Sequence, residues 1–376
     1  MAANGENQRE RMRERPRKGG KPMSKSFVNK VLLGGAVAAG AAVWAIAPRS
    51  FSDKRRNYVP AVPDVWYAHR GLHDAGSGLT AQYANESGEY VALARRMAMK
   101  AGYGSPDTPG VIAPENSLAA FAAACEAGYG IELDLQMTRD GEVVVVHDGD
   151  LMRVAGDPRR IADLTYDELT RIPLFPTDAP GACKAAPLPL ALEEPPLVTT
   201  PDNAPEGYYQ HVPLFADVLK VVAGRVPLIV EYKFDDNSKW DPHDVELMEK
   251  GDALLQAYSG KYVIESFNPA AVNWYKENRP EVCRGQLSWW PYGEDKPTDP
   301  VALGKEYAAG ALVFDWISRP DFVAYDWHGG NSPQVKLARF MGAVPVSWTV
   351  RSRDEYAQCC DQFDRHIFEA FVPDEQ

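Results

Sequence analysis

The sequence predicts an α/β protein whose main body is a TIM-type (β/α)8 barrel with two inserted segments. Apolar runs of strand length recur along the 376 residues with helical segments between most of them, an order typical of parallel strands and covering helices. Eight such runs match the strand number of a closed barrel. Polar residues stand at the ends of several runs, which is where a barrel of this kind places its active site.

The barrel is predicted to span residues 63–376. Its strands are predicted at residues 65–71, 130–134, 142–148, 227–233, 262–267, 283–288, 322–326 and 344–350, and its helices at 116–127, 166–172, 215–223, 243–258, 269–278 and 332–341. Two stretches exceed what a compact barrel needs. Residues 73–113 contain a further helix, "YVALARRMAMKAGY", and residues 173–213 contain ten prolines without an apolar period, which predicts an irregular loop.

The charge distribution separates the N-terminus from the body. Residues 1–56 carry 13 Lys/Arg and 4 Asp/Glu, so the remainder of the chain, whose overall charge is -12, has a net charge of -21. A body this acidic repels phosphate backbones, which argues against nucleic acid as a partner. Residues 1–26 have no apolar period and are predicted to be a disordered, basic, cytoplasmic tail.

An apolar segment follows this tail. Residues 31–47, "VLLGGAVAAGAAVWAIA", carry no charge, and we predict a membrane anchor over 27–48 and a linker over 49–62. Nine Lys/Arg precede position 31 and four lie in 48–60, which predicts a single-pass membrane protein with its main body outside the cytoplasm. One alternative is a cleaved signal peptide ending at Ala45-Ile46-Ala47, although Pro48 directly after this site disfavours cleavage, and another is a segment buried in the protein.

Two carboxylates interrupt the predicted strand at 130–134. Glu132 and Asp134 are two residues apart and therefore share one face of the strand, and Glu231 and Lys233 repeat this spacing after the apolar run "PLIV". A buried carboxylate needs a proton, a cationic partner or a metal ion. Three carboxylates at strand ends predict a Ca²⁺ or Mg²⁺ site. The alternative is an internal salt-bridge network with Lys233 and Arg70.

Two histidines occupy equivalent places. His69 follows the run "VWYA" and His147 follows four valines. Together with the carboxylates, Arg70 and Lys233 they indicate a phosphoryl-transfer site with an acid and a base in place. The forked guanidinium of Arg70 suits a phosphate oxygen, and Lys233 adds a point charge. His73 begins the first inserted segment and is predicted to be a solvated loop residue.

The ordered set of motifs resembles the glycerophosphodiester phosphodiesterase family over about residues 65–370. The motifs are "HRG" at 69–71, "PENSLAAF" at 114–121, "IELDLQMTRDG" at 131–141, "VVHD" at 145–148, "EYK" at 231–233, "ESFNP" at 265–269 and "WTV" at 348–350. The resemblance implies a barrel and one divalent cation, Ca²⁺ or Mg²⁺. The residues matching its cation ligands are Glu132, Asp134 and Glu231, those matching its acid–base pair are His69 and His147, and those matching its phosphate contacts are Arg70 and Lys233.

The implied reaction is hydrolysis of a small-molecule glycerophosphodiester to glycerol phosphate and an alcohol. Asn116 is expected either to bond near the phosphate or to cap the helix that follows it. One rival is a membrane-anchored phospholipase C- or D-like enzyme on intact lipids, with Trp289, Trp290 and Tyr292 contacting acyl chains or headgroups, although these aromatics can equally pack under a loop. Another is a catalytically inactive binding barrel. The two inserted segments are longer than the family usually has, which leaves substrate size and access open.

Overall fold

The computed structural model describes residues 39–52, 61–106, 108, 110–175, 210–237, 239–291 and 297–374. The chain divides into two units, residues 1–43 and 44–376, and the second contains the barrel. In the described ranges, no helix combines the length and the apolar composition that a membrane crossing requires. The predicted tail and most of the predicted anchor lie outside those ranges, as does most of the predicted loop at 173–213.

Eight parallel strands close into a barrel, as the sequence predicts. They are β1 (Trp66–His69), β2 (Gly130–Met137), β6 (Leu228–Tyr232), β7 (Tyr262–Ser266), β8 (Arg284–Ser288), β9 (Phe322–Asp326), β10 (Val344–Val350) and β11 (Arg365–Phe368). β1 pairs with both β2 and β11, which closes the ring. Because all eight strands run in one direction, their carboxyl ends, and the side chains placed there, gather at one end of the barrel.

The strand predicted at 142–148 is not a barrel strand. β3 (Val143–Val145) turns back from β2 and pairs with it antiparallel. The turn between them is closed by a hydrogen bond from Thr138 N to Glu142 O at 3.0 Å and by Gly141 in the left-handed region at φ 81°. A run of valines reads alike in a barrel strand and in a hairpin, so the apolar pattern alone cannot separate the two. The eighth barrel strand is β11, which was not predicted because Arg365 and His366 interrupt its apolar run.

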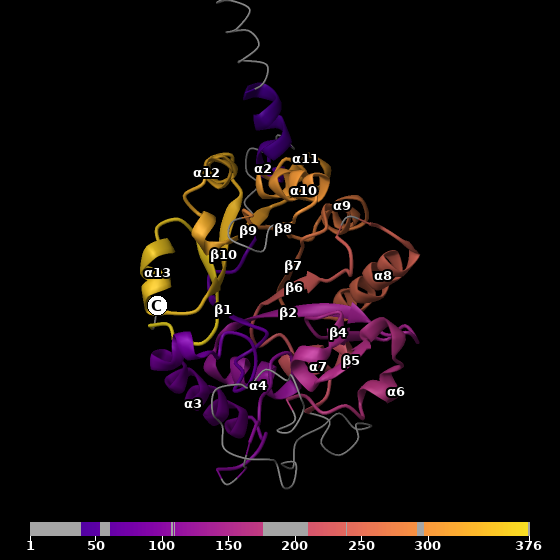
Figure 1. Cartoon of the computed structure of the whole chain (residues 1–376), viewed down its shortest axis with the longest axis vertical. Coiled ribbons are helices and arrows are strands. Elements are labelled where there is room, and N and C mark those ends of the chain that lie inside the picture. Colours follow the sequence, from indigo (N-terminus) through magenta and orange to yellow (C-terminus); the bar gives the residue numbers. More distant parts are fainter. Residues whose placement is uncertain are drawn as a thin grey trace, which may run out of the picture. The chain divides into compact units, whose positions relative to one another are not determined.

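The helices lie outside the barrel strands (Figure 1). They are α2 (Arg49–Ser52), α3 (Ala84–Lys100), α4 (Leu118–Ala127), α5 (Met152–Ala155), α6 (Tyr166–Leu169), α7 (Phe215–Val222), α8 (Pro242–Ala257), α9 (Pro269–Asn278), α10 (Pro300–Gly310), α11 (Asp315–Ser318), α12 (Pro333–Phe340) and α13 (Arg353–Cys359), with single 3-10 turns at Ala81–Tyr83, Ile161–Asp163 and Trp327–Gly329. The predicted helices are all present, α3 among them in the first inserted segment. α2, α5, α10, α11 and α13 were not predicted.

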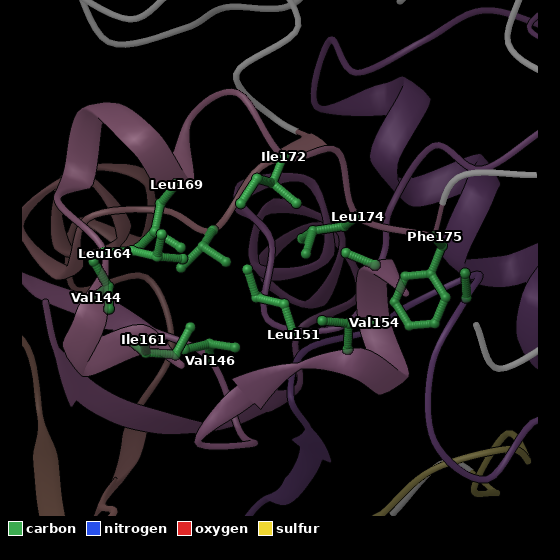
Figure 2. Close-up of a cluster of buried hydrophobic side chains, with 13 residues drawn as sticks. Val144, Val146, Leu151, Val154, Ile161, Leu164, Leu169, Ile172, Leu174 and Phe175 are labelled. Atoms are coloured by element: carbon green, nitrogen blue, oxygen red, sulfur yellow. The ribbon is translucent and has the colours of Figure 1, made fainter. Parts of the chain in front are cut away.

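The chain between β3 and residue 175 forms a small excursion with its own core. A hairpin of β4 (Asp150–Leu151) and β5 (Asp157–Arg160) packs with α5 and α6, and apolar side chains from all parts of the excursion converge (Figure 2). Leu151, Ile161 and Leu169 are fully buried there. Burying each such side chain contributes roughly 1.5–3 kcal/mol to stability. The excursion is thus held firmly, and it carries His147 at its start.

Candidate active site

Three carboxylates meet at the carboxyl ends of two neighbouring barrel strands. Glu132 and Asp134 lie on β2 and Glu231 lies on β6, where Asp134 and Glu231 are direct partners across the strands. One oxygen from each carboxylate lies within 4.8 Å of the others, and all three side chains are buried. The alternation of β2 explains this convergence, since Leu133 points to the opposite face. The structure thus brings together the three carboxylates that the sequence singles out.

The close approach of these carboxylates changes their protonation. Burial, followed by the negative charges of Asp134 and Glu231, raises the pKa of Glu132 well above its usual range. Burial also raises the pKa of Glu231 to about 7, against the attraction of Lys233. It acts in the same direction on Asp134, yet the attraction of His147 and Lys233 outweighs it and holds the pKa of Asp134 below its usual range. Without a cation, the cluster therefore keeps only part of its negative charge at neutral pH.

The three carboxylates fit a divalent cation. Asp134 Oδ1 and Glu231 Oε1 are buried and have no hydrogen-bond partner. Lys233 Nζ lies 3.5 Å from the first oxygen and 3.0 Å from the second, at ion-pair distance but without hydrogen-bond geometry. Buried carboxylate oxygens in this state are costly unless a positive charge compensates them, and oxygen ligands are those that Ca²⁺ and Mg²⁺ prefer. Glu132, Asp134 and Glu231 are thus the residues that can hold such an ion.

Arg70 and Lys233 reach the same cluster. Arg70 Nη1 donates to Glu115 Oε1 at 2.9 Å, while its Nε lies 3.5 Å from Asp134 Oδ2 and has no hydrogen-bond partner. Lys233 Nζ donates to Glu231 Oε2 at 3.2 Å. The ion pairs of a structural salt-bridge network are therefore present, but they leave Arg70 Nε and two carboxylate oxygens unused. A network that served stability alone would satisfy these atoms, so the cluster has capacity to bind charged groups.

The turn after β1 directs Arg70 toward the cluster. Arg70 and Gly71 have φ angles of 56° and 81°, both in the left-handed region. A Cβ at Gly71 would lie 2.9 Å from the backbone of α4, so this close approach requires glycine. Asn116 donates from Nδ2 to Asp134 Oδ2 at 2.8 Å. The cap of α4 is Ser117, whose hydroxyl accepts a backbone hydrogen bond from the helix, so the alternative of Asn116 as the cap is wrong.

His147 is tethered through one ring nitrogen. Its Nδ1 lies 2.7 Å from Asp148 Oδ1, and Arg153 Nε donates to the other oxygen of Asp148 at 2.6 Å. Because a carboxylate only accepts, the ring proton lies on Nδ1, which leaves Nε2 as the nitrogen that can exchange a proton. Burial, followed by the charges of Arg70 and Lys233, lowers the pKa of His147 to about 4. The ring is therefore neutral at pH 7.

His69, at the end of β1, has the same arrangement. Its Nδ1 lies 2.7 Å from Glu369 Oε2, and its Nε2 lies 3.9 Å from Glu132 Oε2. Burial lowers the pKa of His69 although the charge of Glu369 opposes the shift. The barrel end thus holds two imidazoles, each tied through Nδ1 to a carboxylate. Such a pair can take a proton from one oxygen and give a proton to another.

Two carboxylates of the site escaped the sequence analysis. Glu115 accepts hydrogen bonds from both Arg70 and Arg153, and these two arginines hold its pKa below its usual range in spite of burial. It lies inside the motif "PEN", of which only Asn116 was interpreted as a site residue. Glu369 follows β11 and belongs to none of the motifs. It was missed because the strand that positions it was missed.

The prediction that His73 is a solvated loop residue is wrong. Its side chain is completely buried, with Nε2 3.6 Å from Glu369 Oε2 and the ring edge-on to Tyr90 of α3. The inserted segment folds back on itself, since the carboxylate of Asp74 accepts hydrogen bonds from Ile112 N and Ala113 N at 2.9 and 2.8 Å. This closure places His73 under α3 instead of in water.

Comparison with known structures supports the barrel. A Silicibacter pomeroyi protein is 20% identical with a TM-score of 0.52, and the match covers 83% of this chain and 92% of that one. An Oleispira antarctica phosphodiesterase, solved in complex with the product sn-glycerol-3-phosphate, is 17% identical with a TM-score of 0.50, and the match covers 82% of this chain and 93% of that one. At these identities the likeness establishes the fold alone.

Curated relatives match over shorter stretches. A glycerophosphodiester phosphodiesterase of Caldanaerobacter subterraneus is 43% identical over 60 residues, which is 16% of this chain and 25% of that protein. The glycerophosphodiester phosphodiesterase 1 of Bos taurus is 41% identical over 61 residues, 16% of this chain and 18% of that protein. This chain therefore aligns with about a quarter or less of these relatives' lengths.

The family match covers far more of the chain. The model of the glycerophosphoryl diester phosphodiesterase family matches residues 105–364, well over half of the sequence. That range includes the three clustered carboxylates, His147 and Lys233, and the motif with His69 and Arg70 precedes it at the end of β1. The chain belongs to the glycerophosphoryl diester phosphodiesterase family.

Proposed function

We propose that the protein hydrolyses glycerophosphodiesters to glycerol phosphate and an alcohol. The observation that carries this proposal is the meeting of three clustered carboxylates, two tethered histidines, an arginine and a lysine at one end of the barrel. Membership of the family supports the reaction class. The sn-glycerol-3-phosphate bound to the Oleispira antarctica phosphodiesterase supports a glycerol phosphate moiety in the substrate.

Each residue of the site has a proposed role. Glu132, Asp134 and Glu231 hold one divalent cation, Ca²⁺ or Mg²⁺, which when bound neutralises phosphate charge and lowers the pKa of a hydroxyl. Arg70 and Lys233 bind the non-bridging phosphate oxygens by charge-assisted hydrogen bonds. The remaining substrate contact is Asn116, whose Oδ1 is buried without a hydrogen-bond partner and whose amide steadies Asp134.

The two histidines carry the protons. In the first step, one Nε2 takes the proton of the glycerol hydroxyl beside the phosphate, that oxygen attacks phosphorus, and the alcohol leaves with a proton from the other histidine. In the second step, water opens the resulting cyclic phosphate and gives glycerol phosphate. The histidine that acts as the acid must be protonated. Burial lowers the pKa of both histidines, and the negative charge of the bound phosphodiester favours the protonated ring.

Glu369 is expected to act through His69 as a positioning residue. Glu369→Gln keeps one acceptor oxygen but removes the charge that raises the pKa of His69. We expect kcat to fall roughly 10- to 100-fold with little change in KM, in line with losses of other supporting carboxylates. The limb of the pH–rate profile that belongs to His69 should move to lower pH, whether His69 is the acid or the base.

The matched control for this variant is Glu355→Gln. Glu355 accepts a hydrogen bond from the backbone of Arg351, whose side chain donates to Glu369, but Glu355 does not contact His69. The control should keep both kcat and the pH profile. Equal losses in the two variants, with neither profile shifted, would mean that Glu369 serves only the stability of this corner of the barrel.

A substrate screen tests the reaction itself. The full chain, with Ca²⁺ or Mg²⁺, should release glycerol phosphate from glycerophosphocholine and related diesters. The main rival, a phospholipase C- or D-like enzyme, draws on the aromatics after β8, of which Trp290 is 37% exposed and also packs on Tyr307 of α10. That rival requires faster turnover of intact phospholipid than of glycerophosphocholine. Cation binding without hydrolysis of any diester would indicate an inactive binding barrel.

We also propose that residues 27–48 anchor the protein in a membrane, with the barrel outside the cytoplasm. The support is the charge bias, nine Lys/Arg before position 31 against four in residues 48–60. Protease added to intact cells should digest or release the barrel and leave the N-terminal tail protected. A barrel that resists until the membrane is broken would place it in the cytoplasm.

A further inference from the structure

The last residues of the apolar N-terminal segment, and those that follow it, are fixed to one end of the barrel. Arg319 Nη1 donates to the carbonyls of Trp44 and Ala47 at 2.6 and 2.9 Å. Arg49 N donates to Pro320 O at 3.0 Å, and the Arg49 guanidinium forms a buried ion pair of 3.4 Å with Asp321. Residues 44–49 are therefore bound to the barrel and do not form a flexible linker.

This attachment lies at the end where the strands begin. Residues 319–321 directly precede β9, and α2, through Ser50, hydrogen-bonds the carbonyl of Met341 shortly before β10. α2 lies beside α11 in Figure 1. The candidate active site lies at the other end, where His69 closes β1 and Glu231 stands near the end of β6.

Large aromatic side chains are exposed at the attached end. Trp44 is 56% exposed and stacks on Trp316 of α11 with ring centroids 5.5 Å apart, and Trp316 is itself 45% exposed. Phe51 of α2 is 54% exposed, and Phe340, at the end of α12, is 88% exposed. Exposed apolar side chains gathered in one region mark an interaction surface. We call this set the aromatic end of the barrel.

We propose that the aromatic end rests on a lipid bilayer, so that the active site faces away from the membrane into water. The partner is a lipid bilayer because residues 31–47 are apolar and free of charge. Trp44 lies near the end of this stretch, so its stacked neighbour Trp316 must sit at nearly the same depth. Tryptophan favours the boundary between lipid and water, which is the environment this depth provides. The body as a whole is acidic, and large aromatic side chains are exposed at this end, so apolar contact is the mode of binding we propose.

This orientation selects a class of substrate. With the strand starts on the membrane, the strand ends cannot reach acyl chains of the same bilayer, and the site takes up deacylated, water-soluble diesters. The surface itself does not depend on catalysis, whereas this consequence rests on the proposed function. Trp289 and Trp290, directly after β8, lie at the opposite end of the barrel, and they would face the bilayer only if the protein acted on intact lipids.

Quenching of tryptophan fluorescence by brominated lipid distinguishes the two orientations. The full chain is reconstituted in vesicles of phosphatidylcholine and phosphatidylglycerol with or without bromine on the acyl chains near the headgroup. Trp316→Phe should remove a measurable part of the bromine-dependent quenching, and Phe340→Trp should add to it. Trp290→Phe, a comparably exposed tryptophan at the active-site end, should leave the quenched component unchanged.

The opposite pattern overturns the proposal. Loss of quenching in Trp290→Phe but not in Trp316→Phe would turn the active site toward the membrane, and no effect of either Trp316→Phe or Phe340→Trp would show that the aromatic end does not touch lipid. Turnover of added glycerophosphocholine in the same vesicles separates the two claims. Quenching that follows Trp316 without turnover of any diester leaves the surface in place and refutes the proposed function.

Discussion

Glu132→Gln should abolish binding of the divalent cation and lower hydrolysis of glycerophosphodiesters by roughly 10³-fold, the equivalent of the several kcal/mol that a catalytic cation supplies. The stability of the fold should not decrease. Burial and neighbouring charges raise the pKa of Glu132 well above its value in the unfolded chain. A pKa raised by folding means that the folded state disfavours the ionised carboxylate, so at pH 7 without a cation Glu132 costs stability. Glutamine removes this cost, so the cation-free variant should unfold at the same temperature as the wild type or higher.

The control is a neighbouring buried carboxylate outside the ligand group. Glu265 lies on β7 opposite Glu231 and is 1% exposed, and burial raises its pKa as well. Glu265→Gln should retain cation binding in isothermal titration calorimetry. Wild-type cation affinity in Glu132→Gln, or an equal loss in Glu265→Gln, would contradict the assignment of the three ligands.

His69→Ala and His147→Ala should each lower turnover by at least ~10²-fold while the protein stays folded and binds the cation. The reason is that each imidazole is proposed to move a proton at a different oxygen. The double variant should fall little further than the worse single variant, since residues that act as a unit do not add. Cation titration and thermal unfolding of each variant separate catalytic loss from structural loss.

A buried histidine away from the strand-end cluster provides the comparison. His366 lies on β11, where its ring contacts the Ser347 hydroxyl at 2.8 Å. His366→Gln keeps a polar group there and should retain wild-type turnover. Near-normal rates in both His69→Ala and His147→Ala would refute the two-histidine mechanism.

The sequence was sufficient for the residues that stand on regular strands. Two-residue spacing placed Glu132 with Asp134 and Glu231 with Lys233, because a strand continues in a straight line and its alternation fixes which side chains share a face. Where the chain turns away from a regular barrel strand, the apolar pattern did not predict its course. The valine run before His147 turned back as a hairpin, which keeps its local composition but changes its partner.

Residues whose surroundings depend on tertiary contacts could not be predicted from the sequence. Glu369 is recognisable only after β11 joins β1 and brings its carboxylate to His69. His73 looked solvated because nothing in its neighbourhood reveals that the closure through Asp74 covers it. In both cases the partner lies dozens or hundreds of residues away, and the apolar pattern carries no information about such pairs.

The central claim is that the clustered carboxylates bind a divalent cation on which hydrolysis of glycerophosphodiesters depends. Phosphorus NMR of glycerophosphocholine with the full chain tests it most directly, because substrate and glycerol phosphate give separate signals. The account predicts that a chelator stops the conversion and that Ca²⁺ or Mg²⁺ restores it in the wild type but not in Glu132→Gln. Conversion at the same rate with and without chelator, or restoration of the variant by the same ion, would contradict it.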